Sequence, residues 1–141
     1  MYITKNFTLT ELSKTSTGLK NVPPSEAVLW LKILAVAVLQ PLRDEINAPL
    51  YINSGYRCAA VNKRVGGANS SAHLYGRAAD IRVQSERQGL ILMDALRENP
   101  HVDKCLLEFT KSGAVSHLHV QTSKNPRMIF NEHFVISYTQ S

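Results

Sequence analysis

The chain has 141 residues, of which 44% are hydrophobic and 19% charged, and it contains 7 glycines and 6 prolines. These numbers predict a single folded domain over residues 1–141 and exclude a disordered, collagen-like or multidomain chain. The net charge of +5 comes from scattered basic residues without interleaved aromatics, so we expect no nucleic-acid partner.

Two helices are predicted in the N-terminal third of the chain. Thr8 opens a Thr-x-x-Glu capping box, so a short helix begins there. A long helix with Ser25 as its N-cap covers residues 25–47, and Pro41 predicts a kink or local break within it. The longest unbroken apolar run, 33–39, lies in this helix. Because a membrane span needs about 20 apolar residues, we interpret the run as a buried helix face and expect no span.

The remaining predicted elements alternate short strands with helices. Strands are predicted at 50–52, 79–83, 105–109 and 115–121, helices at 57–65 and 85–98, and a closing hairpin of 128–130 with 134–138. Alternation of polar and apolar residues puts Asp80 on one face of its strand and Ala79 and Ile81 on the other. It also puts His117 and His119 on one face of theirs. This order of elements favours an α+β fold with helices packed on a mainly antiparallel sheet.

Two histidines and a carboxylate from the middle of the chain could form a metal site. A catalytic zinc site needs three nitrogen or oxygen ligands and an open position, and His73, Asp80 and either His117 or His119 supply that set. Antiparallel neighbours can bring Asp80 and His119 side by side, while Gly76 lets the backbone fold His73 back over the strand. The same set suits non-haem iron. Alternatively, the histidines are ordinary core or surface residues and Asp80 pairs with an arginine.

A longer motif makes the chain resemble a known family. Residues 71–80 match, at every fixed position, the Ser-x-His-x-x-Gly-x-Ala-x-Asp signature of the zinc D-alanyl-D-alanine carboxypeptidase-like peptidases. The segments 54–57, 61–62 and 65–67 are also similar to that family, and the resemblance covers roughly residues 5–121. It is strongest to the small, phage-associated branch, and it implies the hedgehog/D-Ala-D-Ala peptidase fold.

The resemblance also implies which residues form the active site. His73, Asp80 and His119 match the three ligands of one zinc ion per chain. Arg57 resembles the arginine that faces the reactive water and the scissile carbonyl, and Ser71 resembles a serine that contacts the substrate.

The general base is left open by the resemblance. Several relatives carry an acidic residue three positions before the last ligand, where this chain has Ser116. Glu108 resembles a glutamate of the small branch and is our first choice. The alternative is His117, which replaces a tryptophan usual in that branch and resembles the first histidine of the His-x-His pair of related zinc endopeptidases.

The implied function is hydrolysis of an amide bond in peptidoglycan peptides by a zinc-dependent D-Ala-D-Ala carboxypeptidase or L-Ala-D-Glu type endopeptidase. A weakly active or inactive wall-binding or virion module of the same fold is the alternative. We expect a monomer with two free thiols, Cys58 and Cys105, since the cysteines are isolated in the sequence. Because residues 1–5 contain no apolar signal-peptide core, we expect cytoplasmic synthesis and later release to the wall by a phage or prophage system.

Overall fold

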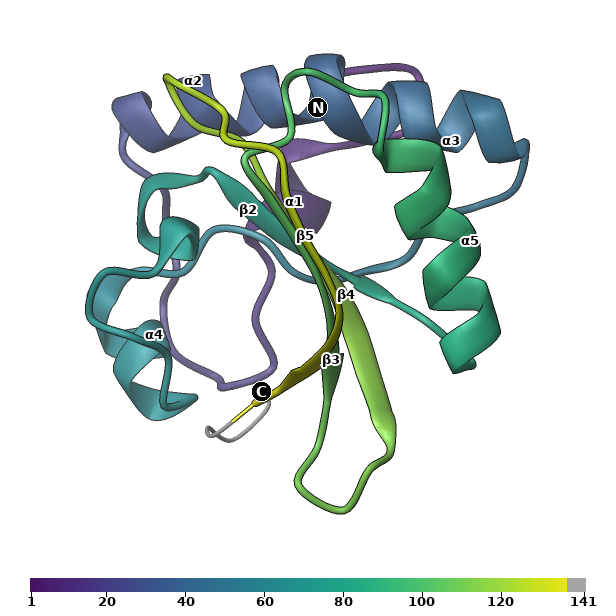
Figure 1. The fold of residues 1–141 in the computed structure, drawn as a ribbon. Coiled ribbons are helices and arrows are strands. Elements are labelled where there is room, and N and C mark those ends of the chain that lie inside the picture. The colour runs from purple at the N-terminus through teal and green to yellow at the C-terminus, as the bar shows by residue number, and fades with distance from the viewer. Residues whose placement is uncertain (137–141) are drawn as a thin grey trace.

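A five-stranded sheet runs through the centre of the protein (Figure 1). The structure is a computed structural model and describes residues 1–136. The strands are β1 (Ile52–Ser54), β2 (Ala78–Arg82), β3 (Lys104–Phe109), β4 (Val115–Gln121) and β5 (Ile129–Val135). They lie in the order β1-β2-β4-β3-β5, with all neighbours antiparallel except β3 and β5. The predicted α+β fold with a mainly antiparallel sheet is therefore confirmed.

The long N-terminal helix consists of three consecutive segments, namely α2 (Ser25–Leu34), the π-helical turn η1 (Ala35–Leu39) and α3 (Gln40–Ile46). Pro41 causes the predicted irregularity, because it has no N–H to donate to the carbonyl of Ala37. The side-chain amide of Asn99 donates to that carbonyl instead, at 2.9 Å. Pro24, not Ser25, occupies the N-cap position, so that detail of the prediction is wrong.

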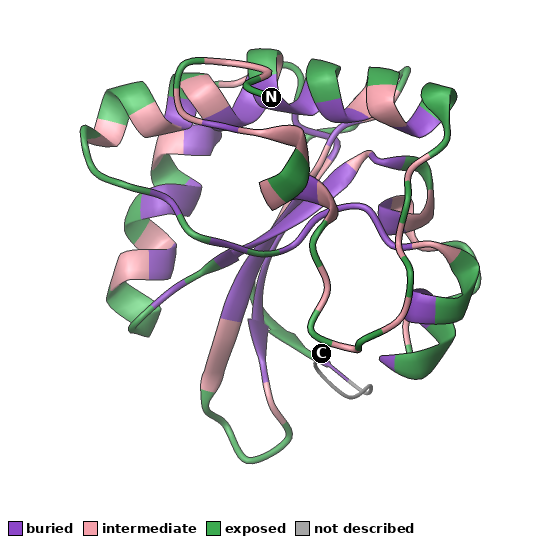
Figure 2. Ribbon diagram, turned by 180° about the vertical axis from the view of Figure 1, so that it is seen from behind, coloured by how far each residue is buried: buried purple, intermediate pink, exposed green. Residues whose placement is uncertain are grey.

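The long helix also provides much of the hydrophobic core. Its 22 residues would be long and apolar enough to cross a membrane by length and composition alone. One face is buried against the sheet, as predicted for residues 33–39. The largest fully buried side chains of the core come from this helix, from residues 7–13 and 86–96 and from the sheet: Phe7, Leu12, Leu31, Leu34, Leu39, Ile52, Ile81, Leu92, Met93, Leu96, Leu107 and Leu118. Figure 2 shows this burial on the strands and on the inward faces of the helices.

Shorter helices complete the two sides of the sheet. They are α1 (Leu9–Ser13), α4 (Ala59–Arg64), the 3₁₀ turn η2 (Ala72–Tyr75) and α5 (Glu86–Leu96). In Figure 1, α5 lies on one side of the strands and α4 on the other. The predicted caps are confirmed, since Thr8 Oγ1 accepts from the N–H of Glu11 and Ser85 Oγ accepts from that of Gln88, both at 3.1 Å.

The short helix α1 contacts the loop that follows β1 through backbone atoms. The N–H of Tyr56 donates to the carbonyl of Leu12 at 2.7 Å. A Cβ on Gly55 would lie 2.2 Å from that same oxygen, so only glycine allows the approach. The loop after β1 is consequently held against the end of α1.

The predicted C-terminal hairpin is wrong. Residues 129–135 form one strand, β5, which runs parallel to β3 at the edge of the sheet. The polar residues Asn131 to His133 lie within this strand, because an exposed edge strand tolerates polar side chains on both faces. The end of the predicted hairpin, 137–138, lies outside the described residues.

The two cysteines are free thiols, as predicted. Cys105 is fully buried in β3, and burial raises the pKa of its thiol to about 12. Cys58 is partly exposed, and its Sγ lies 3.4 Å from the carbonyl oxygen of Lys20.

Candidate metal centre

The three central strands place four ionisable side chains on the face of the sheet opposite the hydrophobic core. Asp80 of β2 pairs directly with His119 of β4, and His117 of β4 pairs with Glu108 of β3. Directly opposite residues have neighbouring side chains, so the sheet register alone gathers the four groups. All four are buried. The predicted placement of Asp80 beside His119, and of both histidines on one face, is confirmed.

The fifth side chain, His73, reaches the same point from η2. Gly76 ends this turn in the left-handed conformation with a φ of 73°. A Cβ at Gly76 would lie 2.4 Å from the carbonyl oxygen of Ala27, so glycine also permits close packing of η2 on α2. The N–H of His73 donates to Ser71 Oγ at 3.2 Å. The predicted fold-back at Gly76 is therefore the way in which His73 reaches the strand.

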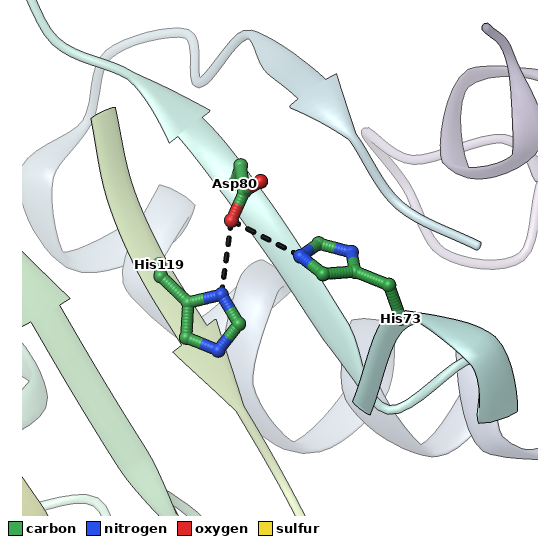
Figure 3. A group of neighbouring side chains, drawn as sticks. All are labelled: His73, Asp80 and His119. Atoms are coloured by element: carbon green, nitrogen blue, oxygen red, sulfur yellow. Dashed lines mark hydrogen bonds and ion pairs between the residues drawn. The ribbon is translucent and has the colours of Figure 1, made fainter. Parts of the chain in front are cut away.

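Three of these side chains converge on one point, as Figure 3 shows. His73 Nε2 lies 3.2 Å and His119 Nδ1 lies 3.0 Å from the same atom, Asp80 Oδ1. One ligand atom from each residue lies within 4.8 Å of the others, so the three could hold a metal ion. Two imidazole nitrogens and a carboxylate oxygen form a donor set that zinc accepts.

Hydrogen bonds on the outer nitrogens orient both imidazoles for this purpose. His73 Nδ1 lies 2.6 Å from the carbonyl of Gly55, which can only accept, so Nδ1 carries the proton and Nε2 is left for a metal. His119 has the opposite arrangement: its Nε2 lies 2.7 Å from Gln121 Oε1, and Nδ1 faces Asp80. Each ring therefore directs the nitrogen that a cation needs toward the centre.

The charges of the cluster also fit a cation. Burial alone would raise the pKa of Asp80, but the nearby imidazoles of His73 and His117 and the hydrogen bond from His119 hold it well below its usual range. Burial lowers the pKa of His73, which favours its neutral form. Burial opposes the charge of His119 as well, yet the hydrogen bond that its Nδ1 donates to Asp80 when the ring is doubly protonated raises its pKa. The site thus presents an ionised carboxylate and at least one neutral imidazole.

The two candidate bases, Glu108 and His117, contact each other. His117 Nε2 lies 2.7 Å from Glu108 Oε1 and 3.3 Å from Asp80 Oδ2. His117 Nδ1 lies 3.0 Å from Ser116 Oγ, so the serine at the position where relatives have an acid contacts the histidine. Burial lowers the pKa of His117, but the carboxylates of Asp80 and Glu108 outweigh it and raise the pKa.

Arg57 lies beside the cluster and is buried at 5% exposure. Its Nη2 donates to Ser71 Oγ at 3.3 Å, and its backbone N–H donates to the carbonyl of His73. Arg57 lines two cavities of about 400 and 370 Å³. The first is also lined by Asp80 and His117, and the second by Ser71 and residues of β3 and β4.

The structure thus brings together every residue that the sequence analysis selected. Sequence reasoning missed Gln121 and the carbonyl of Gly55, which orient the two histidines. Gln121 could have been found, because it shares the alternation of His117 and His119 along one strand. A backbone carbonyl such as that of Gly55 leaves no signal in a sequence.

Comparisons with known proteins agree with this site. The sequence profile of the Peptidase M15 family matches residues 3–121. The chain is also 34% identical, over 83 residues, to the zinc D-Ala-D-Ala carboxypeptidase of Streptomyces albus G. That alignment covers 57% of this chain and 32% of the relative, so the chain spans only about a third of the relative's length. Since the family match includes every side chain of the cluster, the chain belongs to the Peptidase M15 family.

Proposed function

We propose that the protein is a zinc-dependent peptidase that hydrolyses an amide bond in peptidoglycan peptides. The observation that carries the proposal is the convergence of His73, Asp80 and His119, whose ligand atoms lie within 4.8 Å of one another in a member of a peptidase family. The Streptomyces relative, named for its zinc and for the D-Ala-D-Ala bond, supports both the metal and the substrate class.

Zinc held by these three residues would supply the Lewis acidity that activates water for attack on an amide carbonyl. Glu108 then accepts the proton of the attacking water and returns a proton to the leaving amine. His117, at 2.7 Å from Glu108, orients that carboxylate and is the alternative base.

Arg57 stabilises the negative charge that develops on the carbonyl oxygen. Its guanidinium is always charged, and a charge in a buried site acts more strongly than one in water. Ser71 accepts from Arg57 at 3.3 Å and so orients it toward the cavities. The same hydroxyl is close enough to the second cavity to contact a substrate.

Two cavities that share Arg57 in their lining support an endopeptidase over a carboxypeptidase. A carboxypeptidase needs room for only one residue beyond the scissile bond. Here two cavities of about 400 and 370 Å³ share Arg57 and have otherwise different linings, so together they have room for more than one residue beyond the scissile bond.

The test is digestion of purified peptidoglycan by the zinc-loaded protein, with mass analysis of the fragments. We expect cuts within the stem peptide, and release of terminal D-alanine alone would assign carboxypeptidase activity instead. The zinc-free His73→Ala variant is the control and should release no fragments. A wild-type protein that carries zinc and binds the wall but cuts nothing would contradict the proposal and favour a wall-binding module.

A further inference from the structure

Gln121 determines which nitrogen of His119 faces the candidate metal centre. Both residues lie in β4, and Gln121 Oε1 is 2.7 Å from His119 Nε2. An amide oxygen can only accept, so this contact requires the imidazole proton on Nε2. In the neutral ring Nδ1 then keeps its lone pair, and Nδ1 is the atom that faces Asp80.

Asp103 in turn determines which end of the Gln121 amide faces the histidine. Gln121 Nε2 donates to Asp103 Oδ2 at 2.9 Å. A carboxylate can only accept, so the amide nitrogen must point toward Asp103 and the amide oxygen toward His119. Asp103 is buried, and its backbone N–H donates to the carbonyl of Gln121.

Arg127 fixes the carboxylate of Asp103 from the other side. Its Nε donates to Asp103 Oδ1 and its Nη2 to Oδ2, both at 2.9 Å, and its backbone N–H donates to Oδ1 at 3.0 Å. Such a two-pronged contact between guanidinium and carboxylate has a defined geometry. In the chain of hydrogen bonds that runs from Arg127 through Asp103 and Gln121 to His119, the donor and the acceptor of each bond are consequently fixed.

We propose that Gln121, Asp103 and Arg127 are positioning residues, which hold His119 in the tautomer that binds the metal through Nδ1. The inference rests on the proposed zinc site and adds residues outside its three ligands. Hydrogen-bond partners of metal-binding histidines typically change metal affinity or activity by about 10–100-fold when they are replaced.

The isosteric variant Asp103→Asn tests the direction of the hydrogen bonds. The new side-chain oxygen can keep its contacts with the backbone N–H and the Nε of Arg127. The new NH₂ group then replaces Oδ2, so it loses the contact with Arg127 Nη2, faces Gln121 and forces that amide to turn over. An NH₂ group then faces His119 Nε2, the proton moves to Nδ1, and we expect zinc affinity to fall by about 10–100-fold. Asp94→Asn, at an exposed position of α5, is the matched control and should leave zinc affinity unchanged.

A second substitution should reverse the loss. In the double variant Asp103→Asn/Gln121→Glu, the new carboxylate accepts from both neighbours and restores an acceptor for His119 Nε2–H. We expect most of the lost zinc affinity to return, which a merely structural role of Asp103 would not predict. Gln121→Met, which removes the acceptor without touching the pair of Asp103 and Arg127, should also weaken zinc binding.

Zinc affinity is measured by competition with a chromophoric chelator, and the tautomer of His119 by ¹⁵N NMR of the zinc-loaded protein. Equal affinity of wild type and Asp103→Asn, or a double variant no better than the single one, would overturn the inference. A wild-type chain that binds no zinc would overturn it together with the metal assignment. A zinc-binding wild type that cuts no wall peptide would contradict only the proposed activity, because the affinity comparison stands without it.

Discussion

Glu108 and His117 occupy neighbouring positions at the centre, and a proton can pass between them because 2.7 Å separates their polar atoms. The negative charges of Asp80 and Glu108 raise the pKa of His117, although burial opposes this. A raised pKa keeps the imidazole of His117 protonated over a wider pH range, and a protonated imidazole has no lone pair with which to accept a proton from water. The geometry therefore favours Glu108 as the base.

Substituting the two residues separately distinguishes their roles. We expect Glu108→Gln to keep zinc and to lose about 10²–10⁴-fold in kcat, since it removes the proton acceptor but not the shape of the side chain. His117→Asn should also keep zinc, and its loss in kcat should be smaller than that of Glu108→Gln. Metal analysis and turnover on wall fragments are the measurements, and Ser116→Ala is the control for the contact at Nδ1. The opposite order of the two losses would assign the base to His117.

At the scale of single residues, the sequence predicted the cluster itself but not the residues that orient its histidines. The signature from Ser71 to Asp80 and the alternation along β4 selected residues that the structure brings within hydrogen-bonding distance. Histidine and aspartate are informative because few other residues bind metals. Gln121 and Asp103 are ordinary polar residues in a sequence, and only their contacts in space reveal a relation to His119.

Among the secondary-structure elements, η2 has the greatest influence on the centre because it carries His73. It is held against α2 by close backbone packing at Gly76 and by Arg77, whose guanidinium lies 4.3 Å from the ring centroid of Trp30. Stacking of a guanidinium on an indole ring is favourable. The long N-terminal helix thereby supports a metal ligand although it contributes none itself.

Gly76→Ala should separate η2 from α2. The left-handed backbone alone costs about 1–2 kcal/mol with a side chain present, and the new Cβ would also meet the carbonyl of Ala27 at 2.4 Å. We expect lower stability to urea, a changed fluorescence of Trp30 and weaker zinc binding. Gly113→Ala is the matched control, because Gly113 has a φ of 91° with nothing within 4 Å of its Cβ position. An equal effect of both variants on zinc would contradict this role of the packing.

Element predictions succeeded where local signals were strong. Side-chain caps at Thr8 and Ser85 marked two helix starts, and Pro41 marked the irregular turn of the long helix. The C-terminal hairpin failed because β5 pairs with β3, more than 20 residues earlier, and no local pattern specifies a partner so distant.

For the molecule as a whole, the pair of Asp103 and Arg127 connects the start of β3 to the segment before β5. Hydrogen bonds from Arg127 hold the pKa of Asp103 far below its usual value of 3.8, although burial opposes this. A lowered pKa in the folded state means that the ionised carboxylate stabilises folding. This stabilisation is complete above about pH 4 and is lost as the pH falls through the lower pKa of the folded state.

Acid should therefore remove the difference in stability between wild type and Asp103→Asn. We expect wild type to be the more stable protein at pH 7, and the gap in the free energy of unfolding to shrink as the pH falls below about 4. Urea unfolding of the zinc-free proteins at pH 7, 4 and 3 measures the gap without a contribution from metal release. A gap that stays constant over this range would show that the charge of Asp103 is not what stabilises the fold.

The short helix α1 affects the orientation of His73 through the loop that follows β1. His73 is oriented by the carbonyl of Gly55, and the loop carrying Gly55 lies against the backbone of Leu12. Truncation of the chain beyond Leu12 would release that loop, and the imidazole would lose its fixed direction. The backbone at Leu12 thus supports the orientation of His73, although the first twelve residues include none of the candidate ligands or bases.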